Sequence, residues 1–139
     1  MFPSRLNNTK KPNSQPTPQA EEPSDVPQLY DLSKLRKMVD NDQEMINKMI
    51  DMFLKNTPDL LNEMKAFWHK GEIERLSKLA HKLKSSINLM GISTLYDNIR
   101  SIEKFAAESN PEQQAQLPDL MKELNEIMEK VLVQIRQTL

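Results

Sequence analysis

The scarcity of glycine is the feature that most constrains what this chain can fold into. Gly71 and Gly91 are the only two glycines among 139 residues. Leu, Met, Lys, Glu and Gln are abundant instead, and these residues favour a helix over a sheet. The length suits one ordinary domain. We therefore expect a single all-α domain.

The prolines mark a separate N-terminal region. Six of the nine lie between Pro3 and Gln28, among many Asn, Ser, Thr and Gln residues and with almost no hydrophobic pattern. We interpret residues 1–28 as a disordered tail or linker. Residues 29–139 are then expected to form the folded domain.

Helix start and stop signals divide the first half of that domain. A short helix is expected from a cap at Asp31 to about Asn41, with its apolar residues on one side: Leu32, Leu35, Met38 and Val39. Asn41 or Asp42 then caps a longer segment. Pro58 interrupts this segment, so that either two helices meet there or, as we favour, one long helix is kinked. Gly71 suits a helix end that needs positive φ.

The second half carries three further helical segments. One is predicted over residues 72–90, closed by Gly91, and the next over about 93–108. The last helix either starts at Asn110 and is kinked at Pro118, or starts at Pro118 and leaves Pro111 to Leu117 as a separate turn. Short connections between long amphipathic helices favour antiparallel neighbours. The prediction is an antiparallel four-helix bundle, with the additional short N-terminal helix packed as a lid over one end.

The helix over residues 72–90 directs a histidine towards solvent. Successive residues lie about 100° apart on a helix, which places the apolar residues within a sector of roughly 100°. These residues are Leu76, Leu79, Ala80, Leu83, Ile87 and Met90. His81 lies about 150° from the centre of that sector, so we expect its imidazole on the exposed face.

Small and cationic side chains surround His81 on this face. Lys84 lies one turn after it and can stabilise a phosphoryl group attached to the ring. The other neighbours are predicted to dock a partner protein: Ser77, Lys78, Lys82, Ser85 and Asn88. A lone exposed histidine is otherwise most simply one polar residue on a solvated surface, so the spacing of its neighbours decides between the two interpretations.

The residues from His81 to Gly91 resemble the signature of the histidine-containing phosphotransfer (HPt) family. In that signature a histidine is followed by leucine, lysine, a small residue, serine and later a glycine, and four residues match it: Leu83, Lys84, Ser86 and Gly91. The resemblance extends over about residues 29–139. Ser85 departs from it, because the family usually has glycine there. This change affects the fit of a partner more than the fold.

The resemblance implies a carrier in a two-component phosphorelay. His81 would take a phosphoryl group from the phospho-aspartate of a response-regulator receiver domain, which can belong to a hybrid histidine kinase, and would pass it to a second receiver or back. Lys84 would help to hold the group. The receiver supplies both the aspartate and the magnesium, so the protein itself would need no cofactor and no metal site.

Composition disfavours several other functions. The chain has no cysteine for thiolate chemistry or a Cys-based zinc site, and its net charge of −1 gives no reason to expect nucleic-acid binding. His69 and His81 form no His-Glu-x-x-His array, and we interpret His69 as a residue that complements a helix C-terminus. Two glycines cannot build a phosphate-binding loop for ATP, which argues against an autonomous kinase and for a carrier that is not an enzyme.

No apolar signal core and no run of about 18 apolar residues occurs. We therefore expect a cytoplasmic monomer without membrane insertion. The alternative function is a non-catalytic helical-bundle interaction module in signalling, in which His81→Gln would leave function intact.

Overall fold

The computed structural model describes residues 27–138, so the predicted tail lies almost entirely outside the described residues. The described part is helical and contains no strand. Its helices are α1 (Ser33–Met38), α2 (Gln43–Lys70), α3 (Ile73–Leu89), α4 (Tyr96–Ala107), α5 (Pro111–Gln114) and α6 (Leu117–Arg136), with a short 3₁₀ turn at Ser93–Leu95 before α4.

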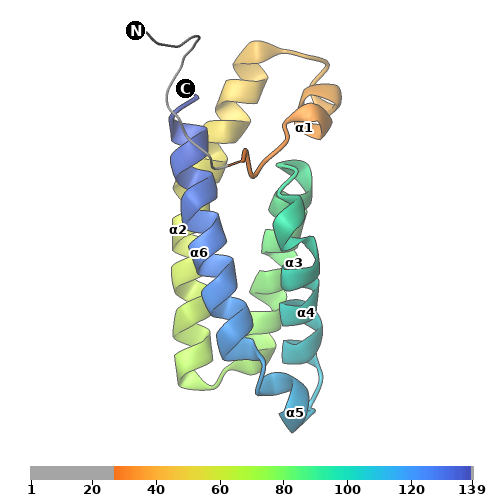
Figure 1. Ribbon diagram of the computed structural model, residues 1–139, viewed down its shortest axis with the longest axis vertical. Helices are drawn as coiled ribbons and strands as arrows, with labels where there is room; N and C mark the ends of the chain where they lie inside the picture. Colours follow the sequence, from red (N-terminus) through yellow and green to blue (C-terminus); the bar gives the residue numbers. More distant parts are fainter. Residues whose placement is uncertain (1–26, 139) are drawn as a thin grey trace, which may run out of the picture.

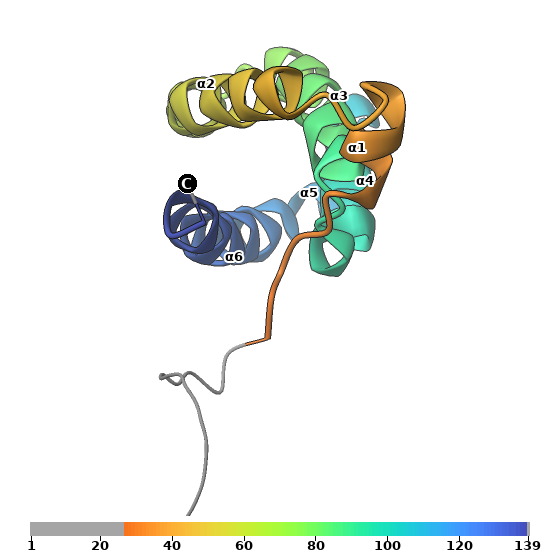
Figure 2. The same ribbon diagram turned by 90° about the horizontal axis from the view of Figure 1, so that it is seen from above.

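The four long helices α2, α3, α4 and α6 form an antiparallel bundle (Figure 1). Seen from above, they enclose a common interior, with α3 and α4 side by side and α1 over the end of the bundle where α3 finishes (Figure 2). The predicted fold class is thus confirmed. No helix in the described part is both long enough and apolar enough to cross a membrane.

Local signals explain the bounds of α2. The Asp42 side chain caps its start by accepting hydrogen bonds from the backbone N–H groups of Glu44 and Met45, at 3.1 and 3.3 Å. Pro58 lies inside a continuous helix, so the alternative of two helices meeting there is wrong. Gly71 ends the helix with φ 75°, a left-handed conformation that favours glycine.

The N-terminal helix differs from expectation at both ends. Leu32 occupies the N-cap position, and the Asp31 carboxylate accepts from the backbone N–H of Ser33 at 2.9 Å instead of capping the helix itself. The helix stops at Met38, because Asp40 and Asn41 adopt positive φ. A helix of six residues buries a single side chain, Leu35. The predicted place of Met38 on the buried side is therefore wrong, since it is 56% exposed.

Both candidate starts of the last helix are used. Asn110 caps the short α5, where its side chain accepts from the N–H of Gln113 at 3.1 Å. A new helix, α6, then begins at Leu117 with Pro118 in its first turn. Proline is tolerated there because the first helical N–H groups have no partner within the helix. The predicted alternative of a separate turn between Pro111 and Leu117 is thus correct.

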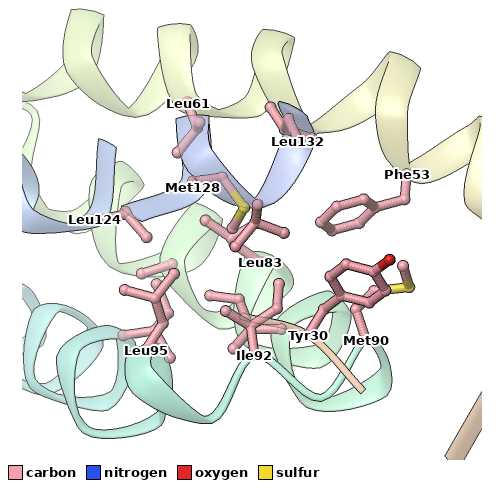
Figure 3. Close-up of a cluster of buried hydrophobic side chains, with 14 of the residues drawn as sticks. Tyr30, Phe53, Leu61, Leu83, Met90, Ile92, Leu95, Leu124, Met128 and Leu132 are labelled. Atoms are coloured by element: carbon pink, nitrogen blue, oxygen red, sulfur yellow. The ribbon is translucent and has the colours of Figure 1, made fainter. Parts of the chain in front are cut away.

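The N-terminal segment closes one end of the core. Tyr30 is buried in the same hydrophobic cluster as Phe53 and Met90 (Figure 3). The backbone N–H of Asp31 donates to the carbonyl of Met90 at 3.0 Å. Gly91 makes this approach possible, because a Cβ at that position would lie 2.3 Å from the Asp31 carbonyl oxygen. The segment thereby fixes the C-terminal end of α3, the helix that carries His81.

Candidate functional site

The register of α3 presents His81 to solvent. Leu76, Ala80, Leu83 and Ile87 are buried in the core, as the helical spacing predicts. The His81 side chain is 65% exposed on the other face. An imidazole in this position is accessible to another protein.

A carboxylate that the sequence did not reveal contacts this imidazole. Glu103 lies on α4, beside α3, and its Oε2 is 2.5 Å from Nδ1 of His81. Its Oε1 accepts a hydrogen bond from Nζ of Lys84 at 2.7 Å. The Glu103 side chain is only 24% exposed. One carboxylate thus joins the histidine and the lysine through different oxygen atoms.

Glu103 is ionised at neutral pH. The hydrogen bond from Lys84 lowers the pKa of its carboxyl group below the ordinary value, and the hydrogen bond with His81 lowers it further, against the opposing effect of burial. An ionised carboxylate can only accept hydrogen bonds. We therefore assign the proton of the contact to Nδ1 of His81. In the neutral imidazole, this leaves the lone pair on Nε2.

Ser77 supports the position of Glu103. Its hydroxyl donates to the backbone carbonyl of Glu103 at 3.0 Å, and the side chain is half-buried between α3 and α4. The sequence predicts that Ser77 docks a partner, and this role stays a prediction. In the structure its hydroxyl joins the two helices about one turn before His81.

The other predicted docking residues are exposed but do not form one cluster. Lys78 and Ser85 are on the exposed surface of α3. Lys82 lines a groove of about 190 Å³ against apolar residues of α2, among them Met52, Phe53 and Leu60. Asn88 lines a different pocket, which is shared with α1. A partner centred on His81 would therefore contact the groove beside Lys82 on one side and the pocket beside Asn88 on the other.

Sequence spacing could not identify Glu103. It follows His81 by 22 residues, and the contact depends on how α3 and α4 are rotated against each other. The weak local signal is its place next to Ile102, a buried residue of α4. Such a residue borders the core and can reach the neighbouring helix.

No group of three or more His, Cys, Asp or Glu residues is arranged to hold a metal ion within residues 27–138. The site is thus an imidazole, a carboxylate and an ammonium group. It offers one exposed nucleophile, with a cation nearby.

Comparison with protein-family models identifies this arrangement. The model of the Hpt domain matches residues 48–133, which is more than half of the chain and includes His81, Lys84 and Glu103. The chain therefore belongs to the Hpt domain family. Hpt domains act as phosphoryl carriers in phosphorelays and interact with receiver domains there. Neither the curated proteins nor the solved structures gave a significant match to the chain.

Proposed function

We propose that His81 accepts a phosphoryl group on Nε2 from the phospho-aspartate of one receiver domain and passes it to the aspartate of another. The observation that carries this proposal is the contact between Nδ1 of His81 and Glu103 on an imidazole that is 65% exposed. Because the carboxylate engages Nδ1, the free lone pair is on the other ring nitrogen. That nitrogen is the nucleophile of the proposed reaction.

The transfer requires no proton movement. The Nε2 lone pair forms a bond to phosphorus while the bond from phosphorus to the aspartate oxygen breaks, and the aspartate leaves as a carboxylate with that electron pair. His81 then carries the phosphoryl group as a cationic ring that retains its Nδ1 proton. In the onward step, an aspartate oxygen of the accepting receiver forms a bond to phosphorus while the electron pair of the N–P bond returns to Nε2, and the neutral imidazole is restored.

The rest of the site contributes charge and rigidity. Lys84 lies one turn from His81, and its ammonium is 2.7 Å from Glu103. A cation there offsets the negative charge that arises when a phosphoryl group arrives beside a carboxylate. Lys78, Lys82, Ser85 and Asn88 on the exposed surface of α3 are candidate docking residues, together with the half-buried Ser77. The bundle holds the nucleophile in a fixed orientation, and the magnesium ion belongs to the receiver.

Phosphoryl uptake from a receiver tests the proposal directly. Candidate receiver domains would be phosphorylated, mixed with the protein, and acid-labile phosphate on the protein would be followed. We expect uptake by the wild type and none by His81→Gln. His69→Gln is the matched control, because His69 is an exposed histidine in the last turn of α2 and should not affect uptake.

Two other outcomes would favour other functions. Equal uptake by His81→Gln and the wild type would remove His81 from the reaction. Binding of receivers without any phosphoryl uptake would favour the non-catalytic interaction module. Incubation with labelled ATP and magnesium in the absence of a receiver tests for an autonomous kinase, and we expect no labelling.

A further inference from the structure

The contact between Glu103 and Nδ1 of His81 also affects how readily the phosphoryl group leaves the ring. We propose that Glu103 is a positioning residue, which holds the proton on Nδ1 of phosphorylated His81 and thereby keeps the ring a good leaving group. This inference rests on the proposed function, because it concerns the phosphorylated form of the same histidine.

The geometry limits the freedom of the carboxylate. Oε2 contacts His81 at 2.5 Å, and Oε1 accepts from Lys84 at 2.7 Å. The backbone carbonyl of Glu103 accepts from the Ser77 hydroxyl at 3.0 Å. Because both oxygens and the backbone are engaged by α3, Glu103 is positioned against Nδ1 before any phosphoryl group arrives.

The chemistry of the leaving group gives this contact its importance. With the proton on Nδ1, cleavage of the N–P bond releases a neutral imidazole. Without that proton, the same cleavage would release an imidazolate anion, which is a far stronger base and a poor leaving group. A carboxylate bonded to Nδ1–H favours the protonated ring through a charge-assisted hydrogen bond. Glu103 therefore increases the fraction of phosphohistidine that can transfer.

Several cations also lie near the site. Lys78, Lys82 and Lys84 are on the same helix as His81. On α4, Arg100 lies one turn before Glu103, and Lys104 follows it. The α2 residues that face Lys82 across the groove are uncharged. Among the described residues, Glu103 is the carboxylate that pairs with the imidazole.

The lifetime of phosphohistidine tests this role without any receiver. Phosphoramidate, a small phosphoryl donor that releases ammonia, can phosphorylate histidine directly. The 139-residue chain would carry His69→Gln so that His81 is its only histidine. Loss of acid-labile phosphate to water would then be measured at neutral and alkaline pH, with and without Glu103→Gln.

We expect Glu103→Gln to slow phosphate loss about tenfold at alkaline pH, where an unassisted ring loses its Nδ1 proton. The difference should shrink as the pH falls, because solvent then protonates the ring in either protein. Glu108→Gln removes a carboxylate at an exposed position at the end of α4 and should leave the rate unchanged. Imidazole ¹⁵N spectra of the unphosphorylated protein should show the Nδ1–H tautomer, and its share should fall in Glu103→Gln.

Two results would overturn the inference. One is equal lifetimes for Glu103→Gln and its parent at every pH. The other is a change by the same factor at all pH values, which would indicate a structural effect only. Failure of the proposed function is a separate result, since it would appear as no transfer from phosphorylated receivers even though phosphoramidate labels His81.

Discussion

Lys84 and Glu103 form an ion pair in which nitrogen and oxygen lie 2.7 Å apart, with the two side chains 27% and 24% exposed. Partial burial protects the pair from the screening that weakens most surface ion pairs. The same carboxylate holds His81. The protonation state of Glu103 therefore links the stability of the bundle to the arrangement of the site.

Acid should destabilise the protein in part through Glu103. Its folded-state pKa lies below the ordinary value of 4.5, chiefly because Lys84 donates a hydrogen bond to it. Between these two pKa values the unfolded chain binds more protons than the folded one, so stability rises with pH in that window. The contribution is fully present above about 4.5 and is lost as the pH falls through the folded-state pKa.

Urea unfolding at a series of acidic pH values measures this effect. The midpoint of the wild type should fall more steeply with decreasing pH than that of Glu103→Gln, which has no carboxyl group to titrate. Glu108→Gln should follow the wild type. Parallel curves for the wild type and Glu103→Gln would show that the ion pair does not stabilise the fold.

The two glycines should differ in their tolerance of alanine. Both have positive φ, 75° at Gly71 and 62° at Gly91, but an added Cβ meets nothing within 4 Å at Gly71 and lies 2.3 Å from the Asp31 carbonyl oxygen at Gly91. Gly71→Ala should cost about 1 kcal/mol for the left-handed backbone alone. Gly91→Ala should cost roughly 2 to 4 kcal/mol, because the N-terminal segment must also move.

Chemical denaturation of both variants provides the comparison, and each variant serves as the control for the other. Equal losses of unfolding free energy would mean that the contact between Asp31 and Gly91 is easily relieved. Such a result would weaken the conclusion that the N-terminal segment fixes the end of α3.

Gln134 should hold the N-terminal segment against α6. Its side-chain carbonyl accepts from the N–H of Leu29 at 2.8 Å, and its amide donates to the carbonyl of Pro27 at 3.0 Å. Gln134→Ala removes both bonds and should cost about 1 to 2 kcal/mol. Amide exchange at Leu29 should accelerate in this variant. Gln134→Glu, which can still accept but cannot donate, should retain slow exchange at Leu29.

Sequence reasoning succeeded where a local pattern determines the structure. The spacing of Leu76, Ala80, Leu83 and Ile87 fixes which face of α3 is buried, and the exposure of His81 follows from it. Gly71 and Gly91 end helices because few other residues adopt positive φ at low cost. These features can be predicted from one helix alone, without the positions of the neighbouring helices.

The features that could not be predicted depend on contacts between elements. Glu103 meets His81 only because α3 and α4 adopt a particular relative rotation, which side-chain packing along the whole interface decides. The hydrogen bond from Ser77 to α4 also depends on how the two helices pack, so the spacing along α3 does not reveal it. Asn110 and Pro118 are equally valid start signals in the sequence, and the structure uses both, for different helices.

Substitution of Ser85 can distinguish an effect on the fit of a partner from an effect on the stability of the bundle. It is exposed on α3, at the position where Hpt relatives usually have glycine by the resemblance drawn from the sequence. Ser85→Gly should lower stability by about 0.5 kcal/mol, because glycine is the poorer helix former. If the serine side chain hinders the approach of a receiver, the same variant should take up phosphoryl groups faster from phosphorylated receivers.

Asn62→Gly is the matched control, because Asn62 is an exposed position within α2, whereas His81 and Ser85 are on α3. It should reduce stability by a similar amount, since asparagine and serine have similar helix propensities, and should leave uptake unchanged. Faster uptake in both variants would assign the effect to a more flexible bundle. Unchanged uptake in Ser85→Gly would show that a receiver accommodates the serine side chain, so that stability alone distinguishes serine from glycine here.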